Sequence, residues 1–363
     1  MKQLLTLIIA LTLAQGAFGQ SHEIATYISD YVKEHHFNGS ILIQQTHKTT
    51  YHHSFGVADR QFNIPTNNGT KYKIASVTKL FTAVLVLQLY EEGKLDLNKT
   101  IGTYLPDYTG VGRDKVTIHH LLNHTSGLTN MDAGLSKESA IKSGIDQYQK
   151  PYTTDELLRK FCSGKLEHEP GKVFDYNNGE YIILGKIIER IYGKSYEQVL
   201  KQRLLQPLRM DDSGFLHQQD VVERLANTYM MSDDLKVLVN DLPVYIENWY
   251  AAGAMYSTTT DLLKFSESLF GFKLTRKETV KLMVQPGLDD YGYSVWAYEV
   301  EINNKQHKAI KRPGRIMGAQ AMLFHFLDDD LSIIILSNTD TTDLDSFVLE
   351  IGKRLIKERV SSH

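Results

Sequence analysis

The chain is poor in the features that mark several protein classes. Its 363 residues contain one cysteine, Cys162, which excludes an intramolecular disulfide. The formal net charge of −3 gives no electrostatic basis for binding nucleic acid or an anionic membrane. No segment after the N-terminus is apolar for long enough to span a bilayer. The chain also has no Gly-x-Ser-x-Gly nucleophile motif and no Gly-rich phosphate loop, which argues against an α/β-hydrolase.

The N-terminus has the pattern of a secretory signal peptide over residues 1–19. Lys2 supplies the positive charge, Leu4 to Leu13 form a short apolar run, and Ala17-Phe18-Gly19 offers small residues for cleavage. The alternative is the N-terminal core helix of a cytosolic protein. No cysteine follows the signal, so a lipid anchor there is excluded. We therefore predict a secreted, periplasmic protein.

Strand patterns occur at both ends of the chain, and helical patterns lie between them. Residues 39–45 and 48–59 predict two strands, and residues 291–302, 305–312, 319–327 and 331–338 predict four more, with an Asn303-Asn304 turn. Residues 345–360 predict a closing helix. The fold class is therefore α/β of the α+β type: a mostly antiparallel sheet flanked by helices, with an inserted helical domain. We expect residues 20–80 and 225–363 in the sheet domain and residues 81–224 in the helical domain.

Several helices carry start or stop signals. Thr153 with Glu156, and Thr258 with Asp261, have capping-box spacing. The apolar segment "SVTKLFTAVLVLQLYEEGKL" has helical periodicity and a plausible stop at Gly93, and "GEYIILGKIIERIYG" ends at Gly193. Cys162 lies in the helical pattern "TTDELLRKFC", where burial is the favoured interpretation and a reactive thiol the alternative.

The segment "IASVTKLF" places Ser76 three residues before Lys79, on one face of a helix. A serine hydroxyl is a weak nucleophile until a base takes its proton, and free lysine is neutral in only about one molecule in 2,500 at pH 7. Burial among apolar neighbours can lower the lysine pKa by the roughly 3 units that a base needs. A capping serine is the competing interpretation. The second copy of the spacing, Ser139 and Lys142, lies in a polar stretch typical of a surface helix.

In this context the chain resembles the serine β-lactamase and penicillin-binding-protein superfamily, in particular its class C-like branch. "IASVTKLF" resembles the Ser-x-x-Lys motif, and "PGKVFDYNNGEY" the Tyr-x-Asn motif through Tyr176 and Asn178. The segments "VTIHHLLNHTSGL" and "AAGAMYSTTTDLLKF" are also similar, and the likeness runs from about residue 25 to the C-terminus. The resemblance implies that Ser76 is the acylated nucleophile, Lys79 its proton partner, Tyr176 the acid and base, and Asn178 a substrate ligand.

The third motif of the family, Lys or His, Thr or Ser, then Gly, is altered. "KSG" at Lys142 to Gly144 precedes Tyr176, so its order is wrong, and "IKRPGRIMGAQ" is the better candidate. Arg312 then takes the basic position, although guanidinium cannot act as a base. Pro313 has neither hydroxyl nor N–H, which is tolerable on an edge strand. Gly314 allows close approach of substrate, and the Arg315 N–H pairs with that of Ser76 as an oxyanion hole. A surface position for Arg312 is the alternative.

Two other clusters offer candidate sites. His119, His120 and His124 suggest a metal site, because His120 and His124 have i, i+4 spacing. No acidic residue has the metalloprotease position and no third ligand is evident, so we favour packing or supporting hydrogen bonds and predict no metal. The aromatic-rich residues 244–250 fit either a substrate cleft or the core.

The sequence therefore predicts a secreted serine hydrolase that forms a covalent acyl-serine on an ester or a D-amino-acid-containing amide, without a cofactor. Its predicted partner is a small-molecule or peptide substrate. The altered third motif argues against efficient β-lactam hydrolysis. The alternatives are a β-lactamase and a non-catalytic penicillin-binding-like sensor or binding protein. The natural substrate and the oligomeric state do not follow from the sequence.

Overall fold

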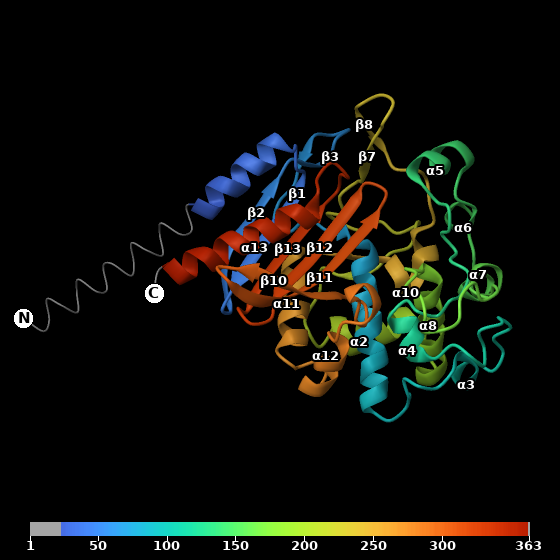
Figure 1. The fold of residues 1–363 in the computed structure, drawn as a ribbon. Helices are drawn as coiled ribbons and strands as arrows, with labels where there is room; N and C mark the ends of the chain where they lie inside the picture. Colours follow the sequence, from blue (N-terminus) through green and yellow to red (C-terminus); the bar gives the residue numbers. More distant parts are fainter. Residues whose placement is uncertain (1–22, 362–363) are drawn as a thin grey trace, which may run out of the picture.

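A computed structural model describes residues 23–361, with side chains as far as residue 357. The predicted signal peptide lies outside the described residues. A six-stranded antiparallel sheet dominates the fold, in the order β10-β11-β12-β13-β1-β2 (Figure 1). Its strands are β1 (Gly39–Gln45), β2 (Lys48–Phe55), β10 (Trp296–Ile302), β11 (Lys305–Ile316), β12 (Ala319–Phe326) and β13 (Leu331–Ser337). The sheet thus joins both ends of the chain, which confirms the predicted fold class.

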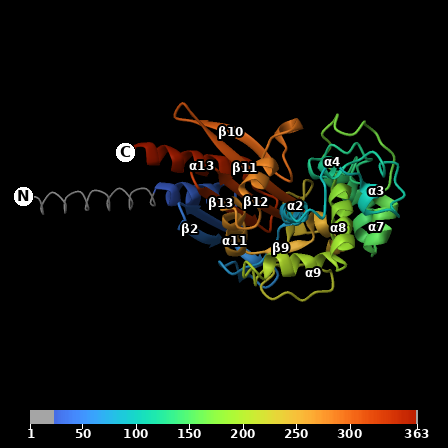
Figure 2. The same cartoon turned by 90° about the horizontal axis from the view of Figure 1, so that it is seen from below.

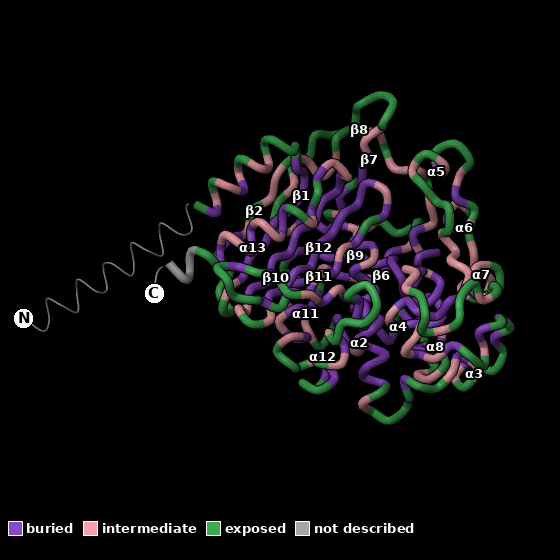
Figure 3. The backbone as a smooth tube through the Cα atoms, in the orientation of Figure 1, coloured by how far each residue is buried: buried purple, intermediate pink, exposed green. Residues whose placement is uncertain are grey.

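Alternating side chains of the sheet pack into two hydrophobic cores, one on each face. On β13, Ile333 and Ile335 pack toward α13 (Leu344–Ser361), whereas Ile334 and Leu336 pack toward the helices on the opposite face. Residues 23–34 form a helix beside α13 on the same face (Figure 1). Apolar side chains on both faces explain why the central strands are buried throughout (Figure 3).

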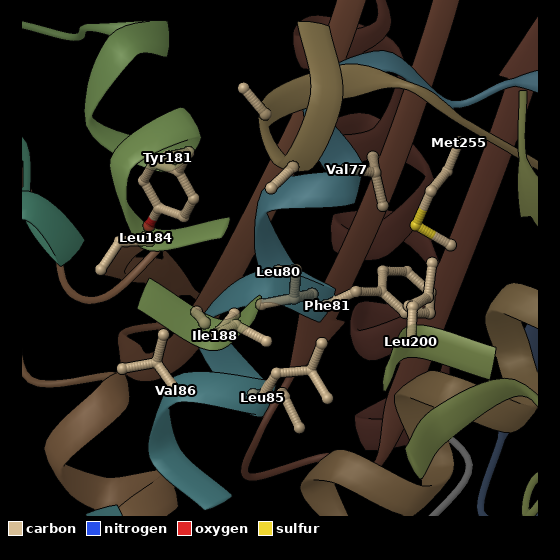
Figure 4. Close-up of a cluster of buried hydrophobic side chains, with 14 of the residues drawn as sticks. Val77, Leu80, Phe81, Leu85, Val86, Tyr181, Leu184, Ile188, Leu200 and Met255 are labelled. Atoms are coloured by element: carbon tan, nitrogen blue, oxygen red, sulfur yellow. The ribbon is translucent and has the colours of Figure 1, made fainter. Parts of the chain in front are cut away.

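Helix α2 (Thr78–Glu91) lies between the sheet and the remaining helices, and its residues from Thr78 to Leu89 are all buried. Figure 4 shows Leu80, Phe81 and Leu85 of α2 among side chains from α8 (Asn178–Tyr192) and α9 (Tyr196–Leu200). Helix α8 begins after the cap Asn177 and ends at Gly193. The helix that follows the candidate nucleophile is thus the central element of the larger core.

Most of the other helices lie beside the sheet, at the right of Figure 2, whereas α11 (Thr259–Phe270) packs against the sheet itself at β13 and β1. These other helices are α3 (Ile101–Tyr104), α4 (Ile118–Leu122), α5 (Lys137–Ser143), α6 (Asp146–Gln149), α7 (Thr154–Phe161), α10 (Tyr250–Gly253), α11 and α12 (Lys277–Met283). Short turns are η1 (Ala75–Val77), η2 (Lys201–Leu205), η3 (Ile246–Trp249) and η4 (Leu288–Asp290). The expected capping box is present at α7, between Thr153 and Glu156, whereas at α11 only the Thr258 side chain caps the helix, by accepting from the Asp261 N–H. Within residues 23–361 no helix is both long and apolar enough to cross a membrane.

Small sheets complete the fold. One has the order β5-β9-β6, built from β5 (Tyr72–Lys73), β9 (Met255–Ser257) and β6 (Gly214–Phe215), and two hairpins pair β3 (Val57–Asp59) with β4 (Ile64–Pro65) and β7 (Tyr229–Met231) with β8 (Leu238–Asn240). The predicted strand 291–302 is too long, because β10 starts only at Trp296. Tyr291 and Ser294 are instead buried, and the Tyr291 hydroxyl and the Ser294 carbonyl oxygen accept hydrogen bonds from Arg312. The predicted domain boundaries stay a prediction.

Candidate active site

Ser76 lies on the one-turn helix η1, directly before α2. Strand β5 leads into this turn, and Ala75 holds a positive φ of 48°, a conformation that residues other than glycine rarely adopt. Buried packing around Ala75 holds the turn in place. Ser76 itself is half-buried. The sequence analysis expected Ser76 to open one continuous helix, whereas the structure gives it a separate turn that presents the hydroxyl at the N-terminus of α2.

Lys79 is fully buried and lies within reach of the Ser76 hydroxyl. Its Nζ is 3.2 Å from Ser76 Oγ, 2.5 Å from Asn178 Oδ1 and 2.9 Å from the Ala252 carbonyl oxygen. Burial, with the nearby Arg312 charge, lowers the pKa of Lys79 to about 8 although neighbouring anionic groups oppose the shift. A neutral amine is therefore far more accessible here than on a free lysine, as the base role requires.

Tyr176 lies above Lys79, whose Nζ is 4.9 Å from the centre of the tyrosine ring. Burial alone would raise the pKa of Tyr176. The Arg312 and Lys79 charges, with a contribution from Ser76, more than offset burial and lower it to about 8. The phenol oxygen accepts a hydrogen bond of 2.5 Å from Arg312 Nη2. Two cations thus favour the phenolate, the form of Tyr176 that can accept a proton.

Arg312 is the largest fully buried side chain among the described residues, so it is not the surface cation that the sequence left open. Its Nε donates to the Ser76 carbonyl oxygen at 2.8 Å. Its Nη1 donates to Tyr291 Oη at 2.8 Å and to the Ser294 carbonyl oxygen at 3.1 Å. With the bond to Tyr176, four of its five N–H groups have acceptors within the protein. The guanidinium joins the nucleophile turn to the Tyr176 loop.

Asn178 is the first residue of α8, and its amide bridges two charged groups. Its Oδ1 accepts from Lys79, and its Nδ2 donates to Asp132 Oδ2 at 2.6 Å. Asp132 in turn accepts from Tyr148 Oη at 2.9 Å and from Gln147 Nε2 at 3.2 Å. Asp132 could not be predicted from the sequence, because it belongs to no motif and lies 46 residues before Asn178.

Gly314 lies against the nucleophile turn. A Cβ at this position would collide with the Ile74 carbonyl oxygen and lie 3.2 Å from the backbone nitrogens of Ser76 and Val77. Only glycine therefore allows β11 to approach the turn this closely. This approach gives the third motif a structural requirement for glycine in addition to the expected role in substrate access.

Pro313 was expected on an edge strand, but β11 is an inner strand of the sheet. Pairing with β10 ends at Lys311, however, so the segment from Arg312 to Ile316 pairs only with β12. The proline is tolerated because one side of β11 is open at this point. Arg315 follows on this segment, with an exposed side chain that donates to Asp345 at 3.1 Å. Its predicted oxyanion contact stays a prediction.

The three histidines do not form a metal site. The expectation that His120 and His124 share a helical face was wrong, because α4 ends at Leu122 and His124 has a φ of 58°. His119 bonds to Tyr293 Oη at 2.6 Å, and His120 caps α4 through the Thr117 N–H. Within the described part of the chain no group of His, Cys, Asp and Glu is placed to hold a metal ion.

His124 packs against Tyr176 and thereby supports the site. It is fully buried, its ring centre is 4.3 Å from that of Tyr176, and its Nδ1 contacts the buried carboxyl of Glu180. Burial lowers the pKa of His124 and raises that of Glu180, so both side chains favour their neutral forms. In the sequence, only the apolar residues on either side of "NHTSG" indicate that His124 is buried.

The remaining candidates lie apart from the site or in the core. Ser139 is on α5, where it bonds to the cap Ser136, and Lys142 pairs with Glu138 at 2.6 Å, as expected of a surface helix. Cys162 is buried, and burial raises the pKa of its thiol. Trp249 of residues 244–250 is buried and stacks on Tyr148 with ring centres 3.5 Å apart.

Comparison with known proteins identifies the family. The sequence profile of the Beta-lactamase family matches residues 24–355. The chain belongs to the Beta-lactamase family. Penicillin-binding protein 4* of Bacillus subtilis (strain 168) is 26% identical over 344 residues, which are 89% of this chain and 73% of that protein. The teichoic acid D-alanine hydrolase of Staphylococcus aureus is 28% identical over 276 residues, 74% of this chain and 65% of that protein.

The fold of this family member agrees with solved structures. The octameric penicillin-binding protein homologue from Pyrococcus abyssi matches with a TM-score of 0.78 and 26% identity, over 93% of this chain and 78% of that chain. Among the curated relatives named above and the putative penicillin-binding protein PbpX of Bacillus subtilis, this chain spans 62% to 73% of each protein's length. The likeness therefore concerns the shared domain.

Proposed function

We propose that the protein is a secreted, periplasmic serine hydrolase that acts through an acyl-serine at Ser76. One observation carries the proposal. The Ser76 hydroxyl lies 3.2 Å from a buried lysine whose pKa is lowered, beside a tyrosine that two cations hold close to its phenolate form. A capping serine needs none of these neighbours, whereas a nucleophilic serine needs an adjacent base to take its proton, and Lys79 and Tyr176 are placed to supply one.

The proposed reaction has two halves. Neutral Lys79, or the Tyr176 phenolate, takes the Ser76 proton as Oγ attacks the substrate carbonyl carbon. The developing oxyanion is held by the backbone N–H groups of Ser76 and Arg315. That proton then passes to the leaving alcohol or amine, from Tyr176 directly or from Lys79 by way of Tyr176, and the acyl–serine ester remains. Water gives a proton to the same base as it attacks that ester, and the base returns the proton to Ser76 Oγ as the acid product leaves.

The neighbours of Arg312 support an ester or a D-amino-acid-containing amide as the substrate. Four of its N–H groups already bond to protein acceptors, and Pro313 offers no hydroxyl. The site is therefore short of donors for the carboxylate that β-lactams carry. The similarity to a teichoic acid D-alanine hydrolase points to the same substrate class.

Steady-state hydrolysis of p-nitrophenyl acetate by the mature protein tests the proposal. We expect Ser76→Ala to lose at least about a thousandfold of kcat, and Ser139→Ala, the matched control with the same spacing, to keep wild-type turnover. Nitrocefin should be turned over poorly. Acylation of Ser76 without turnover would instead favour the non-catalytic binding protein, and efficient nitrocefin hydrolysis would favour a β-lactamase.

A further inference from the structure

Asp132 lies on the loop between α4 and α5, next to the catalytic groups. Its carboxylate accepts hydrogen bonds from Asn178, Tyr148 and Gln147. Only the Asn178 amide separates it from Lys79 Nζ, which is itself 3.2 Å from Ser76 Oγ. The carboxylate thus lies directly beside the Asn178 amide, which is expected to meet the acyl side of a substrate.

No cation contacts the Asp132 carboxylate directly. The charge of Lys79 acts on it only across the Asn178 amide, and among the described residues no Lys, Arg or His nitrogen forms an ion pair with this half-buried side chain. The four residues that follow it, Ala133 to Ser136, are exposed, so solvent and solutes can reach the loop. A partly desolvated anion that no cation contacts directly favours the arrival of a further cation.

Positive and negative side chains therefore lie in different parts of the site. Arg312 and Lys79 surround Tyr176 and the nucleophile turn, whereas Asp132 supplies negative charge beyond Asn178. A substrate that fits this arrangement has a carbonyl for Ser76 and a positive group a short distance away on its acyl side. An amino-acyl group with a free α-ammonium has that shape, because the ammonium nitrogen is one carbon away from the carbonyl.

We propose that Asp132 is a specificity-determining residue that selects acyl groups carrying a free α-ammonium, such as D-aminoacyl esters and amides. This inference rests on the proposed function, since it concerns the acyl group that Ser76 would receive. It adds a residue outside the Ser-x-x-Lys, Tyr-x-Asn and third motifs. N-acylated and anionic acyl groups are disfavoured, because they bring no cation or bring a second anion to Asp132.

The test compares D-alanine methyl ester with N-acetyl-D-alanine methyl ester at pH 7, where the free amine is mostly protonated. The wild-type protein should prefer the ammonium ester in kcat/KM. Asp132→Asn keeps the shape of the side chain and an acceptor for Asn178, and should lose about tenfold or more of kcat/KM for that ester. The acetylated ester should change by less than about threefold.

Asp146→Asn is the matched control, because it removes one negative charge from the nearby surface helix α6, where Asp146 pairs with Lys150. It should leave the preference between the two esters unchanged. An equal loss for both esters in Asp132→Asn would overturn the inference and leave Asp132 only a support for Asn178. A wild-type preference for the acetylated ester would also overturn it. If the wild-type protein hydrolyses neither these esters nor p-nitrophenyl acetate, the proposed function itself fails.

Discussion

Arg312 decides how the site differs from one built on a lysine at the third motif. A lysine at this position can share its proton with Tyr176, whereas guanidinium stays charged at every accessible pH. The fully buried Arg312 donates to the Tyr176 hydroxyl, so its charge favours the phenolate continuously. Proton exchange in the site is therefore left to Lys79 and Tyr176, whose pKa values are both lowered to about 8.

The pH dependence of hydrolysis should follow these two groups. We expect kcat/KM for p-nitrophenyl acetate to rise as the pH rises through about 8, because both groups become bases by losing a proton. Arg312→Gln removes the cation that lowers the pKa of Tyr176. Its rising limb should therefore move upward by about one to three pH units. The measurement is a pH profile from about pH 6 to 11, corrected for spontaneous ester hydrolysis.

Arg312→Lys is the control for charge, since it keeps a cation but loses the planar set of donors. The rate of Arg312→Lys should rise at a pH close to that of the wild type, and the rate of Arg312→Gln at a clearly higher pH. Circular dichroism spectra establish that both variants are folded. A limb at the same pH in Arg312→Gln and in the wild type would show that Arg312 does not set the pKa of Tyr176.

At the scale of elements, the contact between β11 and the η1 turn fixes the nucleophile. Gly314→Ala adds a methyl group that meets the Ile74 carbonyl oxygen, so the turn or the strand must move. Displacement of a nucleophile by about 1 Å costs roughly a hundredfold in rate. We expect a loss of this size in kcat for p-nitrophenyl acetate. Ser76 of the substituted protein should still be acylated by the substrate, only more slowly.

Gly93→Ala separates this contact from the general effect of replacing a glycine. Gly93 follows α2 with a φ of 68°, and nothing lies within 4 Å of a Cβ added there. The substitution should cost about 1 kcal/mol of unfolding free energy through backbone strain and leave kcat unchanged. Equal kcat losses in Gly314→Ala and Gly93→Ala would mean that the close approach of β11 has no special role.

Local signals explain which elements could be predicted from the sequence. The strands β1 and β13 and the helices α7, α8 and α11 carry periodicity, caps or stops within their own residues, and all five were predicted. The break of α4 before His124 and the late start of β10 depend on packing around buried side chains, which no local pattern records. Asp132 and Tyr291 reach the site from loops, through hydrogen bonds to Asn178 and Arg312, and thus gave no signal.

At the scale of the molecule, the candidate site lies where the sheet meets the helices. Arg312 on β11 bonds to the Tyr176 loop, and Lys79 on α2 bonds to Asn178 at the start of α8. The larger hydrophobic core is also continuous, because it includes Leu323 of β12 together with Ile182 of α8. Neither region can therefore lose its structure without exposing apolar surface of the other.

We therefore expect one cooperative unfolding transition, and the two tryptophans can test it. Trp249 lies beside the helices, and Trp296 lies on β10 near Tyr176. Trp296→Phe leaves a fluorescence reporter of the first region, and Trp249→Phe leaves a reporter of the second. In each variant, the urea midpoint from fluorescence should coincide with that from circular dichroism, because both regions share the core around α2. A fluorescence midpoint that departs from circular dichroism in either variant would show that the regions unfold separately, and would support the predicted boundaries near residues 80 and 225 as limits of independent domains.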